Sequence, residues 1–375
     1  MHRLAPRYRW FTGTQHNPLW WPETVGDPRH GSAWALGSRQ DGDGQSFVGA
    51  DPGPAVWIRR GSTGVTPARM DAVVVCAAVR RGVPQDQATI AAARAAAGDQ
   101  LVIAANGYTT PLLGVGDDAE IGGLLHAVGE AADAAGAVPV VLHCPAGDPL
   151  LRVLPRLGYL VGITDLYASI ALPGADLADL LATLPAKRRT TIRRELRAPS
   201  PGAGRIVAGA AAEPFIDPAA ELVAAAYRAR GQSIEPAAVA GNYRRLLAAF
   251  GADFLLSMVF ADDRLLASTC VLTARDTAMS YSAGFRLPEA KTVAGYFNAA
   301  YYLPIKHCYD TGRTTLLLGP GTLEAKRLRG ARFGPLYSAV PRSCAPLAAL
   351  LTRTDAWHRR RLAELPLATA QHPDS

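Results

Sequence analysis

One glycine-framed segment carries the side chains best suited to chemistry. In the segment Gly319–Gly330, one acid and three cations fall within six residues. Glu324, Lys326 and Arg329 are spaced by two and three residues, so one helical turn or a tight loop can present all three to an anionic or carbonyl-bearing substrate. The alternative interpretation is a solvated charge run at the start of a surface helix.

Strands and helices in alternation lead to this segment. Ser280–Gly284 ends a predicted strand, a helix is expected from about Thr292 to Asp310 with a kink near Pro304, and the strand Thr314–Leu318 then leads to Gly319. Four tyrosines of this region are candidates for the wall of a substrate pocket, with core packing as the alternative for each. They are Tyr281, Tyr296, Tyr301 and Tyr302.

A strongly basic run lies near the middle of the chain. Between Leu184 and Arg205 there are seven cations and one acid, Glu195. This pattern predicts a helix with a self-repelling face, shared by residues 189, 193 and 197, that a phosphate-rich ligand would neutralise. A solvated helix between two domains and a membrane-surface helix are the alternatives. The candidate phosphate-binding residues are Lys187, Arg188, Arg189, Arg193, Arg194 and Arg197.

The composition is typical of a soluble globular protein. The chain has 375 residues, a formal net charge of +7, 49% hydrophobic residues and 19% charged residues, which is enough for two domains. It has no apolar run of about 18 residues and no apolar signal-type core at the N-terminus, so a cytoplasmic protein is expected. The five cysteines are odd in number and form no C-x-x-C pair, so neither a disulfide framework nor a metal site is predicted.

The order of elements indicates an α/β (α+β) fold, because each half repeats a strand, a helix and a further strand. In the N-terminal half, strands are expected at 71–77 and 100–104 and a helix at 85–97. The predicted organisation is an irregular N-terminal segment (1–55), an N-terminal domain (56–175), a basic linker helix (176–210), a C-terminal domain (211–345), and a C-terminal helix and tail (346–375).

From Ser280 to Gly330 the sequence resembles the Fem-type, peptidoglycan-biosynthesis branch of the N-acetyltransferase-like (GNAT) superfamily. The resemblance rests on Tyr301-Tyr302 followed by Gly-x-x-Glu-x-Lys-x-x-Arg-Gly at 321–330, and the basic run 184–195 is also similar to the inter-domain segment of that family. It implies two tandem GNAT-like domains, each a mixed central sheet flanked by helices.

Neither half carries the glycine-rich loop with which ordinary acetyltransferases hold the coenzyme A pyrophosphate at a helix N-terminus. In the first half the corresponding residues, 117–122, include Asp118 and Glu120, which are expected to cap a helix; in the second half, 288–295 lacks the glycine spacing. The resemblance therefore implies aminoacyl-tRNA as co-substrate, with no bound cofactor, and acyl-coenzyme A as the alternative donor. Unlike many cell-wall relatives, the sequence has no long charged helical hairpin for tRNA.

These observations predict an N-acyltransferase that moves an aminoacyl group from aminoacyl-tRNA to an amine acceptor by direct attack, since no nucleophile motif is present. Glu324 would orient the amine or accept its proton, and Lys326 and Arg329 would bind a carboxylate or stabilise charge. The acceptor would be a small intermediate of a specialised metabolite or a cell-wall precursor. The expected partners are tRNA and this small amine, without DNA or membrane insertion. The alternatives are an acyl-coenzyme A-dependent GNAT enzyme and a non-catalytic RNA-binding protein on a transferase fold.

Overall fold

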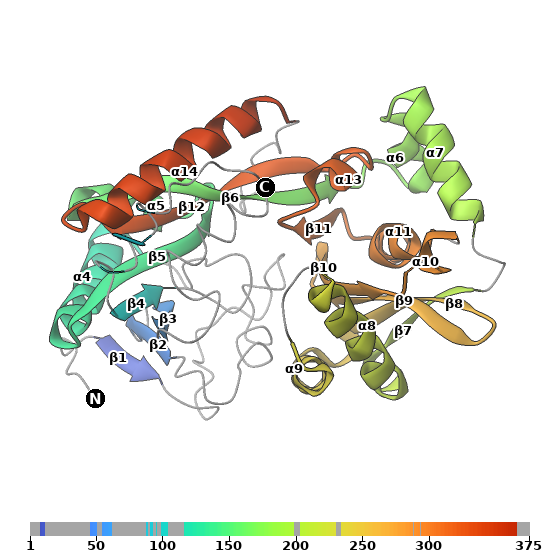
Figure 1. The fold of residues 1–375 in the computed structure, drawn as a ribbon, viewed down its shortest axis with the longest axis horizontal. Coiled ribbons are helices and arrows are strands. Elements are labelled where there is room, and N and C mark those ends of the chain that lie inside the picture. Colours follow the sequence, from blue (N-terminus) through green and yellow to red (C-terminus); the bar gives the residue numbers. More distant parts are fainter. Residues whose placement is uncertain are drawn as a thin grey trace. The chain divides into compact units, whose positions relative to one another are not determined.

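A computed structural model describes residues 8–11, 46–50, 55–61, 88, 91–92, 95, 99–103, 116–198, 203–229, 234–287, 289–292 and 294–365. The strand predicted at 71–77, most of the N-terminal segment and most of the helix predicted at 85–97 lie outside the described residues. The described chain forms two compact units (Figure 1). Unit 2 spans Ala168–Arg332, and unit 1 contains the described residues up to Tyr167 and those from Phe333 onward.

Unit 1 is built on a mixed sheet. Its strand order is β1 (Tyr8–Phe11), β2 (Ser46–Ala50), β3 (Ala55–Gly61), β4 (Asp99–Ile103), β5 (Ala137–Pro145), β12 (Arg332–Pro341) and the first part of β6 (Tyr159–Ala171). Strands β4 and β5 pair in parallel, and helix α4 (Asp118–Ala134) lies between them in the chain. The short helices α5 (Leu150–Val153) and η2 (Leu154–Leu157) follow β5, and α14 (Ala345–Ala363) follows β12.

Alternate residues of the unit 1 strands cover its two faces. Val102 and Val140 pack in one buried cluster with Leu347 of α14. Their chain neighbours Ile103 and Val141 belong to a second cluster, which contains α4. Because successive strand residues point to opposite faces, α4 and α14 cover opposite sides of this sheet.

Unit 2 repeats the plan. Its strand order is the end of β6, then β11 (Thr315–Gly319), β10 (Thr277–Phe285), β9 (Arg264–Thr273), β8 (Phe254–Ala261) and β7 (Gly204–Ala208). Its helices are α6 (Leu177–Ala182), α7 (Ala186–Arg197), η3 (Gly209–Phe215), α8 (Ile216–Arg228), α9 (Pro236–Phe250), η4 (Gly251–Asp253), α10 (Glu289–Thr292), α11 (Gly295–Phe297), the π-helical turn η5 (Asn298–Tyr302), α12 (Leu303–Asp310) and α13 (Leu323–Arg327). The α/β fold class, with mixed sheets flanked by helices, is confirmed.

Helices cover both faces of the unit 2 sheet. Gly284 of β10 lies so close to α8 that a Cβ atom there would be 2.2 Å from the backbone nitrogen of Val223. The next residue, Phe285, packs on the opposite side in a cluster that contains Ala299 of η5. None of the helices among the described residues is long and apolar enough to span a membrane.

The parallel strands β10 and β11 separate along their length. They pair only where Thr277–Met279 face Thr315–Leu317. Beyond this point β10 continues to Phe285, and its pairing with β9 is shifted between Ser280 and Ser282. The carboxyl ends of parallel strands are where ligands commonly bind in open α/β sheets, so the loop after β11 lies at a favourable place for a site.

The edges of the two units lie at residues 167 and 332, whereas the predicted domains have edges at 175, 210 and 345. The basic helix α7, predicted to link the domains, lies within unit 2. The last strand and helix, β12 and α14, lie in unit 1 from Phe333 onward although they follow unit 2 in the chain.

Candidate active site

The loop after β11 has an unusual backbone. Gly319, Gly321 and Gly330 have φ angles of 68°, 77° and 87°, and Thr322 has a φ of 43°. Positive φ angles cost little for glycine but are unfavourable for other residues. The glycines that frame the charged segment therefore allow the chain to leave β11, form the short helix α13 and turn again at Gly330.

Lys326 is a buried cation at the end of β11. Its side chain is 4% exposed, and its Nζ donates to the backbone oxygens of Leu318, Gly319 and Pro320 at 2.8, 2.7 and 2.8 Å. An ammonium group has three hydrogens to donate. These three bonds use all of them, so Lys326 holds α13 against the end of β11 rather than presenting its charge to a ligand.

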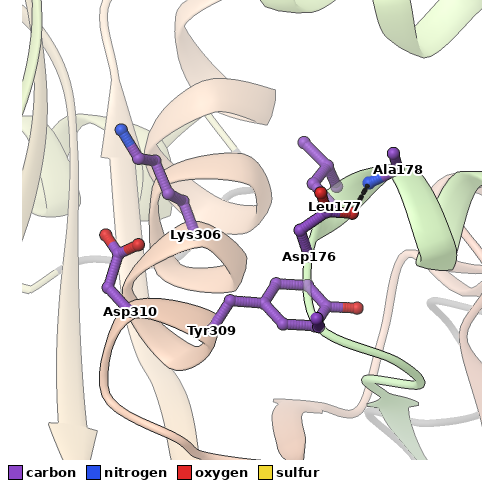
Figure 2. Close-up of a pocket in the computed structure, with 7 residues that line it drawn as sticks. Asp176, Leu177, Ala178, Lys306, Tyr309 and Asp310 are labelled. Atoms are coloured by element: carbon purple, nitrogen blue, oxygen red, sulfur yellow. Dashed lines mark hydrogen bonds between the residues drawn. The ribbon is translucent and has the colours of Figure 1, made fainter.

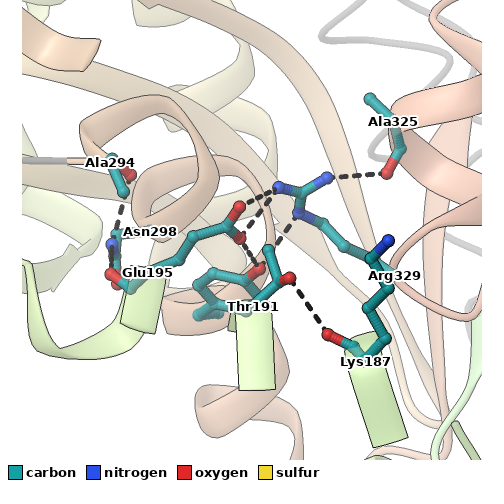
Figure 3. Close-up of polar contacts among 8 residues, drawn as sticks. Lys187, Thr191, Glu195, Ala294, Asn298, Ala325 and Arg329 are labelled. Atoms are coloured by element: carbon teal, nitrogen blue, oxygen red, sulfur yellow. Dashed lines mark hydrogen bonds and ion pairs between the residues drawn. The ribbon is translucent and has the colours of Figure 1, made fainter. Parts of the chain in front are cut away.

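Arg329 forms a buried ion pair with Glu195 of α7 (Figure 3). Its Nη2 lies 2.8 Å from both Glu195 carboxylate oxygens, its Nε donates to the Tyr302 hydroxyl at 3.0 Å, and its Nη1 donates to the backbone oxygen of Ala325 at 2.8 Å. The guanidinium carbon lies 3.3 Å from the centroid of the Phe297 ring. The two charged side chains are 6% and 14% exposed, so the pair is shielded from solvent.

The π-helical turn η5 completes this contact. The Tyr302 hydroxyl donates to the Glu195 carboxylate, and the Asn298 Nδ2 donates to the Glu195 backbone oxygen at 2.9 Å. Burial raises the pKa of Tyr302 well above its ordinary value, although the Arg329 charge acts in the opposite direction. The phenol therefore keeps its proton and donates it to Glu195. We call Glu195, Asn298, Tyr302 and Arg329 the Glu195 brace.

Glu324 does not join the two cations. Its carboxylate pairs with Arg327 at 2.7 Å on the exposed side of α13. One turn therefore does not present Glu324, Lys326 and Arg329 side by side in this structure, and the catalytic roles expected of them stay predictions. The physical reason is that the two cations have internal partners, the carbonyls that end β11 and the carboxylate of Glu195, which their spacing does not reveal.

Two of the four candidate tyrosines, Tyr301 and Tyr302, lie beside Arg329, and Tyr296 packs on Tyr301. Tyr301 and Tyr302 are 1% and 3% exposed, and the rings of Tyr296 and Tyr301 meet edge to face with centroids 5.9 Å apart. Tyr281 lies apart, on β10, where its hydroxyl accepts from the Asn242 Nδ2 at 3.2 Å. A role for these residues in a substrate pocket stays a prediction.

Helix α7 has a cationic outer face. Lys187, Arg193, Arg194 and Arg197 are exposed, and Arg188 is partly buried. The spacing predicts that Arg189 shares a face with Arg193 and Arg197, but Arg189 is partly buried and donates from Nη1 to the backbone oxygen of Leu184 at 2.7 Å. On the inner side, Ile192 is 3% exposed and Glu195 joins the brace. We call the four exposed cations the α7 cationic face.

In ordinary acetyltransferases the coenzyme pyrophosphate binds at the N-terminus of a helix. The N-termini of the corresponding helices in this chain differ from such a site. At α4, Asp117 and Glu120 form a capping box, with each side chain accepting from the backbone N–H of the other. Asp118, also expected to cap, pairs instead with Arg152 and Arg156. After β10, the first helices are only four and three residues long, and Ala294 between them has a φ of 48°.

A shallow pocket lies elsewhere in unit 2, between α6 and α12 (Figure 2). Asp176 uses its carboxylate to cap α6, and the Tyr309 hydroxyl donates to the backbone oxygen of Pro173. Lys306 and Asp310 complete the polar wall and are exposed. The pocket contains none of the predicted site residues, and its polar groups are spread over an open surface.

The turn at Gly330 gives a first prediction. Gly330→Ala is expected to lower the free energy of unfolding by about 1–2 kcal/mol, because an alanine at this φ is strained and its Cβ would lie 3.1 Å from the Leu184 Cδ2. Gly129→Ala is the matched control, since it adds a Cβ inside α4 with no atom within 4 Å and is expected to be neutral or stabilising. Urea denaturation of the two variants measures the difference. Equal stability of both variants would contradict the strained turn.

Buried tyrosines give a second prediction, on alkaline stability. Burial raises the pKa of Tyr159 and of Tyr281 to about 12, and raises that of Tyr243 and Tyr301 well above its ordinary value. In the unfolded chain a phenol ionises near pH 10. The unfolded state therefore loses protons that the folded state keeps, and the free energy of unfolding should fall as the pH rises above about 10. Urea denaturation at increasing pH checks this, and Tyr281→Phe should show a shallower fall than the wild type.

One family model matches part of the chain. Residues 186–327, from α7 through α13, match the family model described as an acetyltransferase (GNAT) domain. The chain therefore contains a GNAT domain, and the brace, the α7 cationic face and the loop after β11 lie within the matched region or end just beyond it.

Solved structures show the same fold over most of the chain. The chain is similar to FemX, with 10% identity and a TM-score of 0.56 over 84% of this chain and 92% of that one. L-PGS from Bacillus licheniformis has 11% identity and a TM-score of 0.50 over 88% and 98% of the two chains. A conserved protein of unknown function from Bacteroides thetaiotaomicron has 13% identity and a TM-score of 0.54 over 86% and 94%. The resemblance to the Fem-type branch of the GNAT fold is thus confirmed for the fold, and no curated protein sequence matches the chain.

Proposed function

We propose that the protein is an N-acyltransferase that forms an amide bond with an aminoacyl group delivered by aminoacyl-tRNA. The observation that carries the proposal is the α7 cationic face. Four exposed cations lie on one side of a single helix, and no ion pair among the described residues neutralises them. A face of this kind suits the phosphate backbone of a nucleic acid, which binds by counterion release and without regard to sequence.

The N-termini of helices α4, α10 and α11 support aminoacyl-tRNA as the donor. Carboxylates in the capping box of α4 would repel a pyrophosphate, and the short α10 and α11 offer no regular helix N-terminus after β10. Fem-type transferases, which the sequence resembles, take their acyl group from aminoacyl-tRNA. The GNAT domain itself favours acyl-coenzyme A as the second candidate donor.

The proposed reaction is direct attack of an amine on the aminoacyl ester. The new amide bond forms as the ester bond to the tRNA ribose breaks; the amine loses one proton and the ribose oxygen gains one. Glu324, exposed beside the loop after β11, is the candidate group to orient the amine or accept its proton. Lys326 and Arg329 contribute by shaping that loop. The acceptor is a small intermediate of a specialised metabolite or a cell-wall precursor.

Binding experiments test the donor class. Fluorescently labelled total tRNA is expected to bind the wild-type protein with an affinity that falls steeply as salt increases. A ligand that binds the folded state raises the melting temperature. Since the proposal includes no coenzyme A site, coenzyme A is expected to leave the melting temperature unchanged. Tight binding of coenzyme A together with absent tRNA binding would replace the proposal by an acyl-coenzyme A-dependent enzyme. Glu324→Gln should retain tRNA affinity, which separates binding from chemistry.

A further inference from the structure

Glu195 is the single acid of helix α7. Three side chains contact it: Asn298 at its backbone oxygen, and Tyr302 and Arg329 at its carboxylate. Asn298 and Tyr302 lie four residues apart in the π-helical turn η5, and Arg329 follows α13. Helix α7 is thereby fixed to two elements that are more than 100 residues away in sequence.

The start of α7 meets the same loop. Leu184, two residues before the helix, contacts Gly330 so closely that a Cβ on Gly330 would lie 3.1 Å from the leucine Cδ2. Arg189 donates to the Leu184 backbone oxygen and so ties the first turn to this contact. One end of α7 is therefore bonded to Arg329, and the other end begins next to the following residue, Gly330.

The anchoring side and the cationic side of α7 are different. Ile192 and Glu195 face the body of unit 2, whereas Arg193, Arg194 and Arg197 face outward. The exposed cations take no part in the brace, so their charges stay available to a ligand while the helix is fixed. The same loop that holds α7 is fastened to the end of β11 by Lys326.

We propose that Glu195 is a positioning residue, which fixes the α7 cationic face to the end of β11 through Arg329 and so sets where a bound RNA presents its acyl group. This inference rests on the proposed function. Misplacing a reacting group by about 1 Å can cost on the order of 100-fold in rate. A helix freed from its anchor would still attract RNA but would deliver the ester to the wrong place.

The changes in RNA affinity and in turnover together distinguish a positioning role of Glu195 from a purely electrostatic one. Glu195→Gln removes a negative charge from α7, the most basic of the helices that the structure describes, which by charge alone favours RNA binding. Positioning predicts the opposite result for catalysis, a loss of turnover. Glu221→Gln on the exposed surface of α8 makes the same charge change away from the brace and is the matched control.

The test compares wild type, Glu195→Gln and Glu221→Gln by three measurements on the full chain. With labelled total tRNA, Glu195→Gln is expected to bind as tightly as wild type or up to about threefold tighter. Its kcat for transfer from aminoacyl-tRNA should fall about 100-fold without a matching rise in KM. Hydrogen exchange of the α7 amides should become about tenfold faster, and Glu221→Gln should match wild type in all three.

The proposal would be overturned if Glu195→Gln kept the wild-type kcat and the wild-type hydrogen exchange of the α7 amides. It would also be overturned if the variant lost only tRNA affinity. If Glu195→Gln fails to fold, Tyr302→Phe replaces it, because it removes only the hydroxyl that donates to Glu195. If the wild-type protein transfers nothing, the proposed function fails. The exchange of the α7 amides then decides on its own whether Glu195 fixes the helix.

Discussion

The Arg329→Met substitution is expected to lower the free energy of unfolding by about 3–5 kcal/mol, the range typical of removing one partner of a buried ion pair. The reason is that Glu195 would keep its charge inside unit 2 with its cation gone, since the two side chains are 6% and 14% exposed. The methionine also forfeits the hydrogen bonds to Tyr302 and Ala325. Urea denaturation with circular dichroism measures the loss.

The neighbouring pair provides the control. Arg327→Met breaks the exposed contact with Glu324, and the change in the free energy of unfolding should stay within about 0.5 kcal/mol. The double variant Glu195→Gln/Arg329→Met should be less destabilised than the sum of its single variants, because removing both charges leaves no unpaired ion. Additive losses, or an Arg329→Met variant as stable as Arg327→Met, would contradict a buried ion pair at this site.

The second large effect concerns RNA binding. Replacing Arg193, Arg194 and Arg197 by Gln is expected to weaken binding of labelled total tRNA strongly. The slope of log affinity against log salt should fall by about three, since each arginine that neutralises one phosphate accounts for about one unit of slope. These three side chains are exposed, so the free energy of unfolding should change little. Fluorescence anisotropy over a series of salt concentrations gives both the affinity and the slope.

An equal charge change elsewhere in unit 2 is the matched control. Replacing Arg228, Arg264 and Arg275 by Gln removes three exposed cations outside α7. This variant should keep the wild-type slope to within about one unit, because its charges do not neutralise phosphates of the RNA. If both triple variants weaken binding and reduce the slope equally, RNA responds to the overall charge of the protein, and the α7 cationic face is not a site.

Local patterns in the sequence predict much of unit 2. The alternation of residues 253–261 and 264–273 around an Ala-Asp-Asp turn predicts a hairpin, and the structure confirms it as β8 and β9. Asp262 and Asp263 between them have φ angles of 48° and 61°, which suit a tight turn between antiparallel strands. The strand before the charged segment is confirmed within one residue, as β11. These features depend on residues close together in the chain, where alternation and turn chemistry act directly.

The helix before β11 is predicted only in outline. The sequence predicts one helix from about Thr292 to Asp310 with a kink near Pro304, and the structure has the π-helical turn η5 directly before α12, whose first turn contains this proline. The interruptions come earlier, at Ala294 with its positive φ and at the π-helical turn η5. The positive φ of Ala294 is the break that turn chemistry does not predict, because alanine is unfavourable in this conformation.

The partners of the site residues could not be deduced from spacing. The pairing of Glu195 with Arg329 joins residues 134 positions apart, and the role of Lys326 depends on the path of the loop after β11. One signal was available. Glu195 is a lone acid within a run of cations, and it follows the buried Ile192 by about one helical turn, which places it on the inner side of its helix. A charge that faces the interior needs a partner, and Arg329 supplies it.

The measurement that tests the central claim most directly is transfer itself. The wild-type protein is incubated with a total aminoacyl-tRNA pool and a mixture of small amines, or with acetyl-coenzyme A and the same amines, and the products are identified by mass spectrometry. We predict new aminoacyl amides that do not form when the tRNA is first digested with ribonuclease. The Glu195→Gln variant should form these amides much more slowly than the Glu221→Gln variant. Amides that form only with acetyl-coenzyme A and resist ribonuclease would contradict a tRNA-borne donor.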